Sequence, residues 1–187
     1  MVDKIVRTQR DGNLVWLDLE MTGLDSSSDV ILQAALIITD KDLVPLEEYS
    51  CDIWQPDQEV SRMTPFVRDM HTKNGLIERV RASKLELASA EKRLLERVSG
   101  WCQYPAILCG NTVGQDKRFV ERWMPGLGTY LSYRIVDVSS LKILARLWHG
   151  EEAVFKKSEE REHDALVDIR NSIAELRHYR TILFKAT

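Results

Sequence analysis

Residues 16–23, WLDLEMTG, place two acids one position apart at the end of an apolar run. The run LVWLDLE over 14–20 predicts a buried strand. Side chains alternate across a strand, so Asp18 and Glu20 point to the same face, about 7 Å apart along the chain. Carboxylates are costly to bury unless something positive meets them. The pair can therefore hold a cation, or it can simply begin a turn at residues 21–23.

Predicted strands and helices follow one another along the rest of the chain. Further strands are expected at 30–39, 48–54, 106–109 and 134–138, and helices at 85–101, 116–124, 139–148 and 165–184. The charged residues 156–162 predict a mobile loop, and residues 1–12 a flexible N-terminal tail. Three early strands followed by alternating helices and strands indicate an α/β fold. We expect a mixed sheet flanked by helices, in a single domain over residues 1–187.

The bulk composition excludes several classes of protein. Of the 187 residues, 44% are hydrophobic and 29% charged, which is typical of a globular domain. No apolar run approaches the roughly 18 residues that span a bilayer, and the N-terminus lacks a secretory signal, so no membrane partner is expected. The net charge of −3 argues against a track for long nucleic acid or duplex. Three widely spaced cysteines favour a reducing compartment, the cytoplasm, or the mitochondrion if the source is eukaryotic.

Two more acids and a histidine stand at positions that suit a metal site. Asp116 lies in the first turn of a predicted helix, where the helix dipole alone could explain it. Asp168 lies at the edge of the apolar stripe of the last helix, so it can face inward toward other acids. Asp164 points further out and is better explained as a helix cap or first-turn acid. His163, on a charged loop, is either solvated or a general base beside metal-bound water, since its ordinary pKa is about 6.5.

The order of these residues is more specific than any one of them. D-x-E, then Asp, then H-x-x-x-x-D resembles the DEDDh group of 3′→5′ exonucleases, which share a ribonuclease-H-like fold. Within that group, five segments resemble the oligoribonuclease family: WLDLEMTGLD (16–25), HTKNGL (71–76), GNTVGQDKRF (110–119), YRIVDVSSLK (133–142) and HDALVDIRNSIAELRHYR (163–180). The resemblance runs from about residue 14 to residue 179.

The resemblance implies an exoribonuclease that works in the 3′→5′ direction on very short RNA. Its substrates would be oligoribonucleotides of a few residues, especially 5′-phosphorylated dinucleotides, and its products nucleoside 5′-monophosphates. Two divalent cations, Mg²⁺ or Mn²⁺, would be held by Asp18, Glu20, Asp116 and Asp168. His163 would take a proton from the attacking water. The acids at the end of the first strand would then be tolerated because cations neutralise them.

The resemblance also implies a homodimer in which each subunit completes its neighbour's site. Leu24 matches a wedge residue, and Phe66 stands near the bases. Tyr133 matches a tyrosine of the catalytic set. Arg134, Ser139 and Ser140 match positions of a cap for the 5′ phosphate and, like Tyr133, would reach across the dimer. Thr112 is a further substrate-binding position. Without the family, Arg134 would be a strand-edge charge and Ser139 a helix N-cap.

This sequence departs from the family pattern at a few positions. Gln33 stands where glutamate is common, and Val167 where a second acid is frequent. Phe66 replaces a common tryptophan, Thr112 a serine and Ser140 a threonine. None of the four acids changes, so activity is expected rather than an inactive adaptor of the same fold. A DNA-directed exonuclease of the DEDDh group is the other alternative, which the cap residues disfavour.

Overall fold

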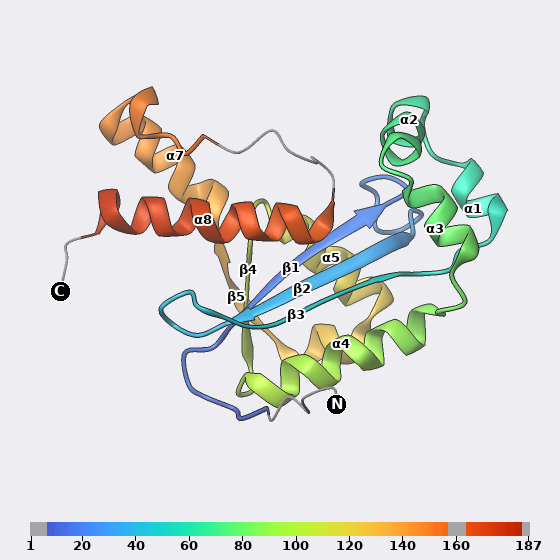
Figure 1. Cartoon of the computed structure of the whole chain (residues 1–187), viewed down its shortest axis with the longest axis horizontal. Helices are drawn as coiled ribbons and strands as arrows, with labels where there is room; N and C mark the ends of the chain where they lie inside the picture. The colour runs from blue at the N-terminus through green and yellow to red at the C-terminus, as the bar shows by residue number, and fades with distance from the viewer. Residues whose placement is uncertain (1–6, 157–163, 185–187) are drawn as a thin grey trace, which may run out of the picture.

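A five-stranded mixed sheet forms the centre of the computed structural model, which describes residues 7–156 and 164–184 (Figure 1). The strands are β1 (Leu14–Met21), β2 (Ile31–Thr39), β3 (Pro45–Asp52), β4 (Ala106–Gly110) and β5 (Leu131–Asp137). They lie in the order β3-β2-β1-β4-β5. β2 pairs antiparallel with both β1 and β3, whereas β4 is parallel to both β1 and β5. The predicted α/β class with a mixed sheet is confirmed.

Helices cover both faces of this sheet, so a strand in its interior can be buried along its whole length. The helices α4 (Leu87–Trp101), α5 (Gly114–Trp123) and α6 (Pro125–Tyr130) lie on one face, and α8 (Ala165–Leu183) crosses the other beside α7 (Val138–His149) (Figure 1). All nine residues of β2 are buried. Leu17 packs with the first layer and Trp16 with the second, as the period of two in a strand requires.

Three short helices follow β3, in a stretch for which no element was predicted. They are α1 (Asp57–Ser61), α2 (Pro65–Lys73) and α3 (Leu76–Ala82), and they lie beside the end of β1 (Figure 1). Their apolar residues form a small core of their own against Leu32 of β2. A 3-10 turn, η1 (Glu151–Ala153), follows α7. The sequence also predicted only a stop at Pro125, but α6 begins there, because proline suits the first position of a helix.

The sequence predicted the N-cap of α8 correctly but not the N-cap of α7. Asp164 caps α8, and its side chain accepts hydrogen bonds from Leu166 N and Val167 N, as expected. The alternative that Ser139 caps α7 is wrong. Asp137 is the cap, and its carboxylate accepts from Ser139 N, so α7 begins one residue earlier than predicted. The helix therefore starts after Asp137 rather than after Ser139.

The described part of the expected N-terminal tail contacts the domain. Arg7 donates to both carboxylate oxygens of Glu47, at 2.7 and 2.6 Å, and Arg10 forms a β-bridge with Cys102. Residues 1–6 and the expected loop at 156–162, apart from Lys156, lie outside the described residues, as does His163. None of the described helices is long and apolar enough to cross a membrane.

Candidate functional site

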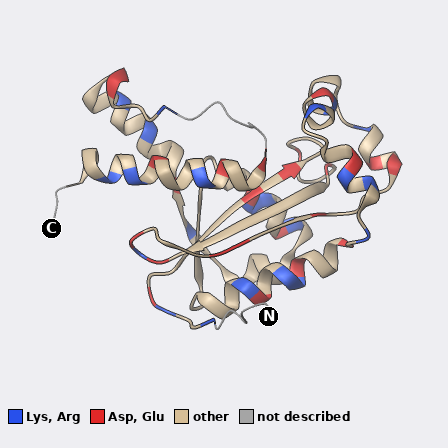
Figure 2. Cartoon of the chain, in the orientation of Figure 1, with Lys and Arg blue, Asp and Glu red and all other residues tan. Residues whose placement is uncertain are grey.

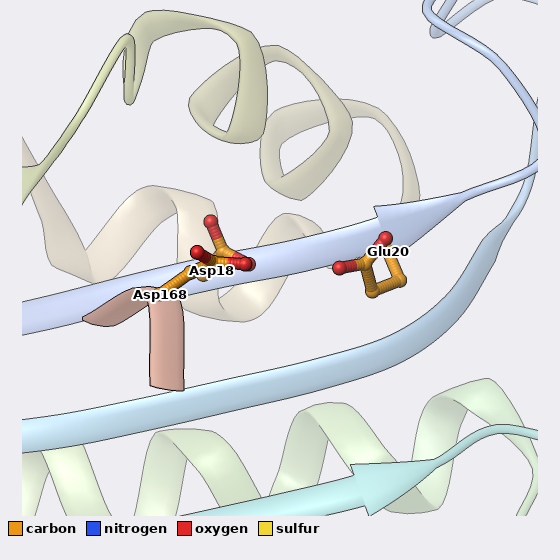
Figure 3. A group of neighbouring side chains, drawn as sticks. All are labelled: Asp18, Glu20 and Asp168. Atoms are coloured by element: carbon orange, nitrogen blue, oxygen red, sulfur yellow. The ribbon is translucent and has the colours of Figure 1, made fainter. Parts of the chain in front are cut away.

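Three carboxylates converge where β1 passes under the beginning of α8. One oxygen each from Asp18, Glu20 and Asp168 lies within 4.8 Å of the others (Figure 3). In Figure 2 the acidic segments on β1 and at the adjacent end of α8 lie side by side. Asp18 and Asp168 are half-buried, and Glu20 is only 8% exposed. Three oxygen ligands at this spacing are the donor set that hard divalent cations prefer.

Local structure explains why these acids meet. Asp18 and Glu20 share one face of β1 because side chains alternate, and a register shift after Glu20 ends the regular pairing with β2. Asp168 lies in the first turn of α8, and its N–H bonds to Asp164 O at 2.9 Å. Ile169 and Ile173 bury the same side of α8 against the sheet. The structure thus places Asp168 on the inward edge that its helical spacing predicts.

Asp116 lies beside this group, in the first turn of α5, and is 7% exposed. Its Oδ1 accepts a hydrogen bond at 3.0 Å from Leu19 N, the peptide between the two acids of β1. Burial raises the pKa of Asp116 to about 7, against the lowering effect of the Leu19 bond, and the charge of Asp137 adds to the rise. The backbone of β1 therefore holds one carboxylate oxygen of Asp116 and orients the side chain.

The acids repel one another, and the repulsion is concentrated on Glu20. Burial, followed by the charges of Asp168, Asp116 and Asp164, raises the pKa of Glu20 to about 8, while Arg79 opposes the rise. A buried carboxylate among like charges is stabilised by a bound cation or by a proton. The donor atoms, their spacing and their shared negative charge all fit a divalent cation at this position.

His71 of α2 is a buried neighbour of Glu20 that the sequence did not single out. Its Nε2 lies 3.0 Å from Met21 O and its Nδ1 lies 3.8 Å from Glu20 Oε2. A carbonyl oxygen only accepts, so Nε2 carries the proton. The ring ties α2 to the end of β1. HTKNGL, the segment that contains His71, was matched to the family, and that match was the only available signal.

Gln33 lies opposite Glu20 in the register of β1 and β2. Its Nε2 donates to Asp52 Oδ1 at 2.7 Å, and its Oε1 accepts from Ala165 N at 3.4 Å. The amide therefore joins β3 to the start of α8. A glutamate at this position could accept from Ala165 but could not donate to Asp52. The departure from the family pattern has a definite structural use in this chain.

Two of the expected substrate-binding residues meet at the start of α7. Thr112 N donates to Asp137 Oδ1 at 2.9 Å and to Ser139 Oγ at 3.0 Å, and the two hydroxyls are 3.1 Å apart. Thr112 has φ of 53°, a left-handed conformation that turns the chain from β4 into α5. The turn brings its hydroxyl to Ser139. Ser140 is exposed on the next position of α7.

The remaining expected substrate residues are exposed on the single chain. Leu24 is 74% exposed, Phe66 77% and Tyr133 77%. The guanidinium of Arg134 lies 4.8 Å from the ring centre of Tyr133, within the range of a cation–π contact. Large exposed apolar side chains of this kind are typical of residues that contact a ligand or a second subunit.

Comparison with known proteins identifies the family. A family model described as exonuclease matches residues 15–176. An oligoribonuclease of Francisella tularensis (strain WY96-3418) is 44% identical over 174 residues, which cover 92% of this chain and 96% of the relative. The chain belongs to the oligoribonuclease family. An oligoribonuclease from Colwellia psychrerythraea is 45% identical over 179 residues, which cover 94% of this chain and 97% of the relative.

Solved structures show the same fold as this member of the oligoribonuclease family. Exonuclease I from Methylocaldum szegediense superimposes with a TM-score of 0.71 at 22% identity over 90% of this chain. E. coli exonuclease I, in complex with a 5cy-dT13 oligonucleotide, superimposes with a TM-score of 0.73 at 16% identity over 92% of this chain. The chain spans about 40% of the length of these two structures. The expected exonuclease fold of the ribonuclease-H-like type is confirmed.

Proposed function

We propose that this chain is a 3′→5′ exoribonuclease that degrades very short oligoribonucleotides to nucleoside 5′-monophosphates. The observation that carries the proposal is the convergence of Asp18, Glu20 and Asp168 from two elements on one buried point. Membership of the oligoribonuclease family supplies the substrate class. A single phosphodiester at the 3′ end would lie over this point, next to the acids.

Asp18, Glu20 and Asp168 are the residues that would hold divalent cations, and Asp116 would join them with its second carboxylate oxygen. We propose two ions, Mg²⁺ or Mn²⁺, because four carboxylates offer more charge than one divalent ion balances. When bound, such ions activate a water molecule and stabilise the leaving oxygen of a phosphodiester. Leu19 N keeps Asp116 oriented, and His71 joins α2 to the carbonyl of Met21, the residue after Glu20.

His163 is proposed as the general base. It immediately precedes Asp164, the N-cap of α8, and Asp168 lies one turn further along the helix. Its place in the sequence, directly before the helix that carries Asp168, supports this role. A histidine with an ordinary pKa near 6.5 can accept a proton from water at neutral pH.

A short substrate would be selected at its 5′ phosphate. Thr112 and Ser139 offer hydroxyls from one point of the fold, and Ser140 lies next to them on α7. Arg134 would add a charge-assisted hydrogen bond, which is stronger than a neutral one. Leu24 and Phe66 would contact the bases. An acidic chain without long-range attraction for phosphates must obtain its affinity from the few nucleotides in the site.

We propose that the protein acts as a homodimer, with Tyr133 and Arg134 serving the neighbouring subunit. On α7, Ile143 is 54% exposed, Leu147 72% and Trp148 63%. Ile143 and Leu147 are four residues apart and so share one face of the helix. α7 follows β5, which carries the tyrosine and the arginine. In a dimer formed through this face, Tyr133 and Arg134 of each subunit would lie near the site of the other subunit.

The three cysteines are free thiols, which supports a reducing compartment such as the cytoplasm.

The test is release of nucleoside 5′-monophosphates from a 5′-phosphorylated diribonucleotide in the presence of Mg²⁺ or Mn²⁺. We expect release to stop in excess chelator and in Asp168→Asn. The corresponding deoxydinucleotide and a long RNA serve as comparison substrates. Faster cleavage of DNA than of RNA would indicate the DNA-directed alternative, and turnover in excess chelator would refute the metal-dependent reaction.

A further inference from the structure

A carboxylate lies buried in α8 about two turns beyond Asp168. Glu175 is fully buried. Its Oε2 accepts a hydrogen bond from Asn111 Nδ2 at 2.9 Å, and its Oε1 accepts from Tyr179 Oη at 3.0 Å. Both partners are neutral, although a buried carboxylate is most readily stabilised by positive charge. A glutamine or a leucine would be less costly here, so the carboxylate is expected to do something that only an acceptor can do.

Glu175 determines which way the side-chain amide of Asn111 faces. Both oxygens of Glu175 accept hydrogen bonds, from Tyr179 Oη and from Asn111, so the group of Asn111 that faces Glu175 is its NH₂. The same NH₂ donates to Ser172 Oγ at 2.8 Å. The carbonyl oxygen of the amide is thereby turned to Ser139, whose hydroxyl donates to it at 3.1 Å. Reversal of the amide would face its NH₂ to Ser139 and its oxygen to Glu175.

The amide of Asn111 connects the acidic group to the hydroxyls at the start of α7. On one side, Ser172 Oγ donates to the backbone carbonyl of Asp168 at 2.9 Å. On the other side, Ser139 Oγ accepts from Thr112 N at 3.0 Å. One side chain therefore joins the helical turn of Asp168 to the pair Thr112 and Ser139. Because each bond has a short fixed length, the connection sets the distance and orientation between the two groups.

We propose that Glu175 and Asn111 are positioning residues that hold the Thr112 and Ser139 hydroxyls at a fixed place relative to the acidic group. Through this they set the preference for a 5′ phosphate one nucleotide away from the bond that is cleaved. The inference rests on the proposed function, since it concerns the substrate of that site. Neither residue needs to touch the substrate, and the effect is one of orientation.

The test uses Glu175→Gln, which keeps the size of the side chain and allows the amide of Asn111 to reverse. Two substrates are compared, a diribonucleotide with a 5′ phosphate and the same diribonucleotide without it. One neutral hydrogen bond corresponds to roughly a 2- to 12-fold effect. We expect kcat/KM to fall by that factor for the phosphorylated substrate, mainly through KM. For the unphosphorylated substrate it should change by less than about twofold, because the acids are untouched.

The matched control is Glu47→Gln, another buried glutamate, bound to Arg7 and to Trp101 Nε1 at the opposite end of α4 from the helices α1–α3. It should lower the unfolding temperature but leave the ratio of the two kcat/KM values unchanged. Tyr179→Phe removes the other hydrogen bond of Glu175, and it should also leave the ratio unchanged. A general loss of stability is thereby separated from a loss of positioning.

A reciprocal exchange tests the orientation itself. Asn111→Asp alone sets two carboxylates against each other, so it should reduce the phosphate preference more than Glu175→Gln does. Combined with Glu175→Gln, the amide and the carboxylate exchange places, and an oxygen again faces Ser139. Recovery of the preference in the double variant supports the inference. Equal losses on both substrates in Glu175→Gln, or a double variant no better than Asn111→Asp, would overturn it. A wild-type protein that hydrolyses neither dinucleotide contradicts the proposed function instead.

Discussion

Replacing Glu20 by glutamine should stabilise the metal-free protein at pH 8 while it removes activity. Glu20 is 8% exposed and lies with Asp18 and Asp168 within 4.8 Å. Burial and the neighbouring charges of Asp168, Asp116 and Asp164 raise its pKa from 4.5 to about 8. Without a cation, the folded chain must either protonate this carboxylate or keep it ionised among like charges. Glutamine has the same shape and no charge, so it avoids both costs.

The sign of the pH dependence follows from the direction of this change in pKa. The folded state holds the proton more tightly than the unfolded state does, so protonation of Glu20 favours folding. The contribution is complete below about pH 4.5 and is lost as the pH rises toward about 8. The metal-free wild-type protein should therefore become less stable between these values. In Glu20→Gln this part of the pH dependence should be absent.

The size of the effect has an upper bound. A change in pKa from 4.5 to about 8, at about 1.4 kcal/mol for each tenfold change in proton affinity, gives at most about 5 kcal/mol. The acids titrate together, so the part assigned to Glu20 alone is smaller. For a domain of this length, 1 kcal/mol moves the unfolding temperature by about 2–4 °C. We expect a gain of several degrees at pH 8 and little gain at pH 5.

The assay is thermal unfolding in chelator at pH 5 and pH 8, for wild type, Glu20→Gln and the exposed control Glu78→Gln. Added Mg²⁺ or Mn²⁺ should raise the unfolding temperature of the wild type more at pH 8 than at pH 5, because protons compete with the cation for the carboxylates. The same cation should stabilise Glu20→Gln less. The reasoning is refuted if Glu20→Gln is less stable than the metal-free wild type at pH 8, or if both lose stability equally between the two pH values.

Three further predictions concern the proposed roles of residues outside the acidic group. His163→Ala should lower kcat by roughly 10²- to 10⁴-fold while cation-dependent stabilisation persists, and wild-type turnover from pH 6 to 9 would remove it as the base. In sedimentation, Trp148→Glu should shift the protein from dimer toward monomer, and activity should fall with the dimer fraction. A variant dimer as stable as the wild-type dimer would contradict this. Arg134→Ala should weaken binding of the 5′-phosphorylated dinucleotide by roughly 10- to 150-fold. A mixture of the Arg134→Ala and Asp18→Ala proteins should regain activity as their subunits exchange. If activity does not recover although exchange is proven, the site is not shared between subunits.

The sequence by itself determined the elements that carry the acids. Alternation along β1 put Asp18 and Glu20 on one face, and the 3.6-residue period of α8 turned Asp168 inward. Both are local properties, since they depend only on the geometry of a strand or a helix. The order of the acids and the histidine along the chain indicated the DEDDh group, and the segments around them indicated the oligoribonuclease family.

The same reasoning could not predict the three short helices. α1, α2 and α3 have five, nine and seven residues, too few turns for an apolar period to be distinct. Isolated helices of this length are marginal in water, and these are stabilised by packing of Leu76 and Val80 against Leu32 of β2. His71 reaches Glu20 only through that packing, so its place beside the acids could not be foreseen.

Contacts between residues far apart in the chain were decided by the tertiary structure alone. The sequence placed Asp116 in the first turn of a helix, but only the parallel pairing of β4 with β1 brings it to Leu19 N. The pairing of β4 with β5 and the packing of α8 on the sheet set Asn111 between Ser139 and Glu175, which is 64 residues further along the chain. Periodicity shows which way a side chain points from its own element, whereas its partner depends on strand order and layer packing. The acids are thus a property of the sequence, and the network that positions them is a property of the fold.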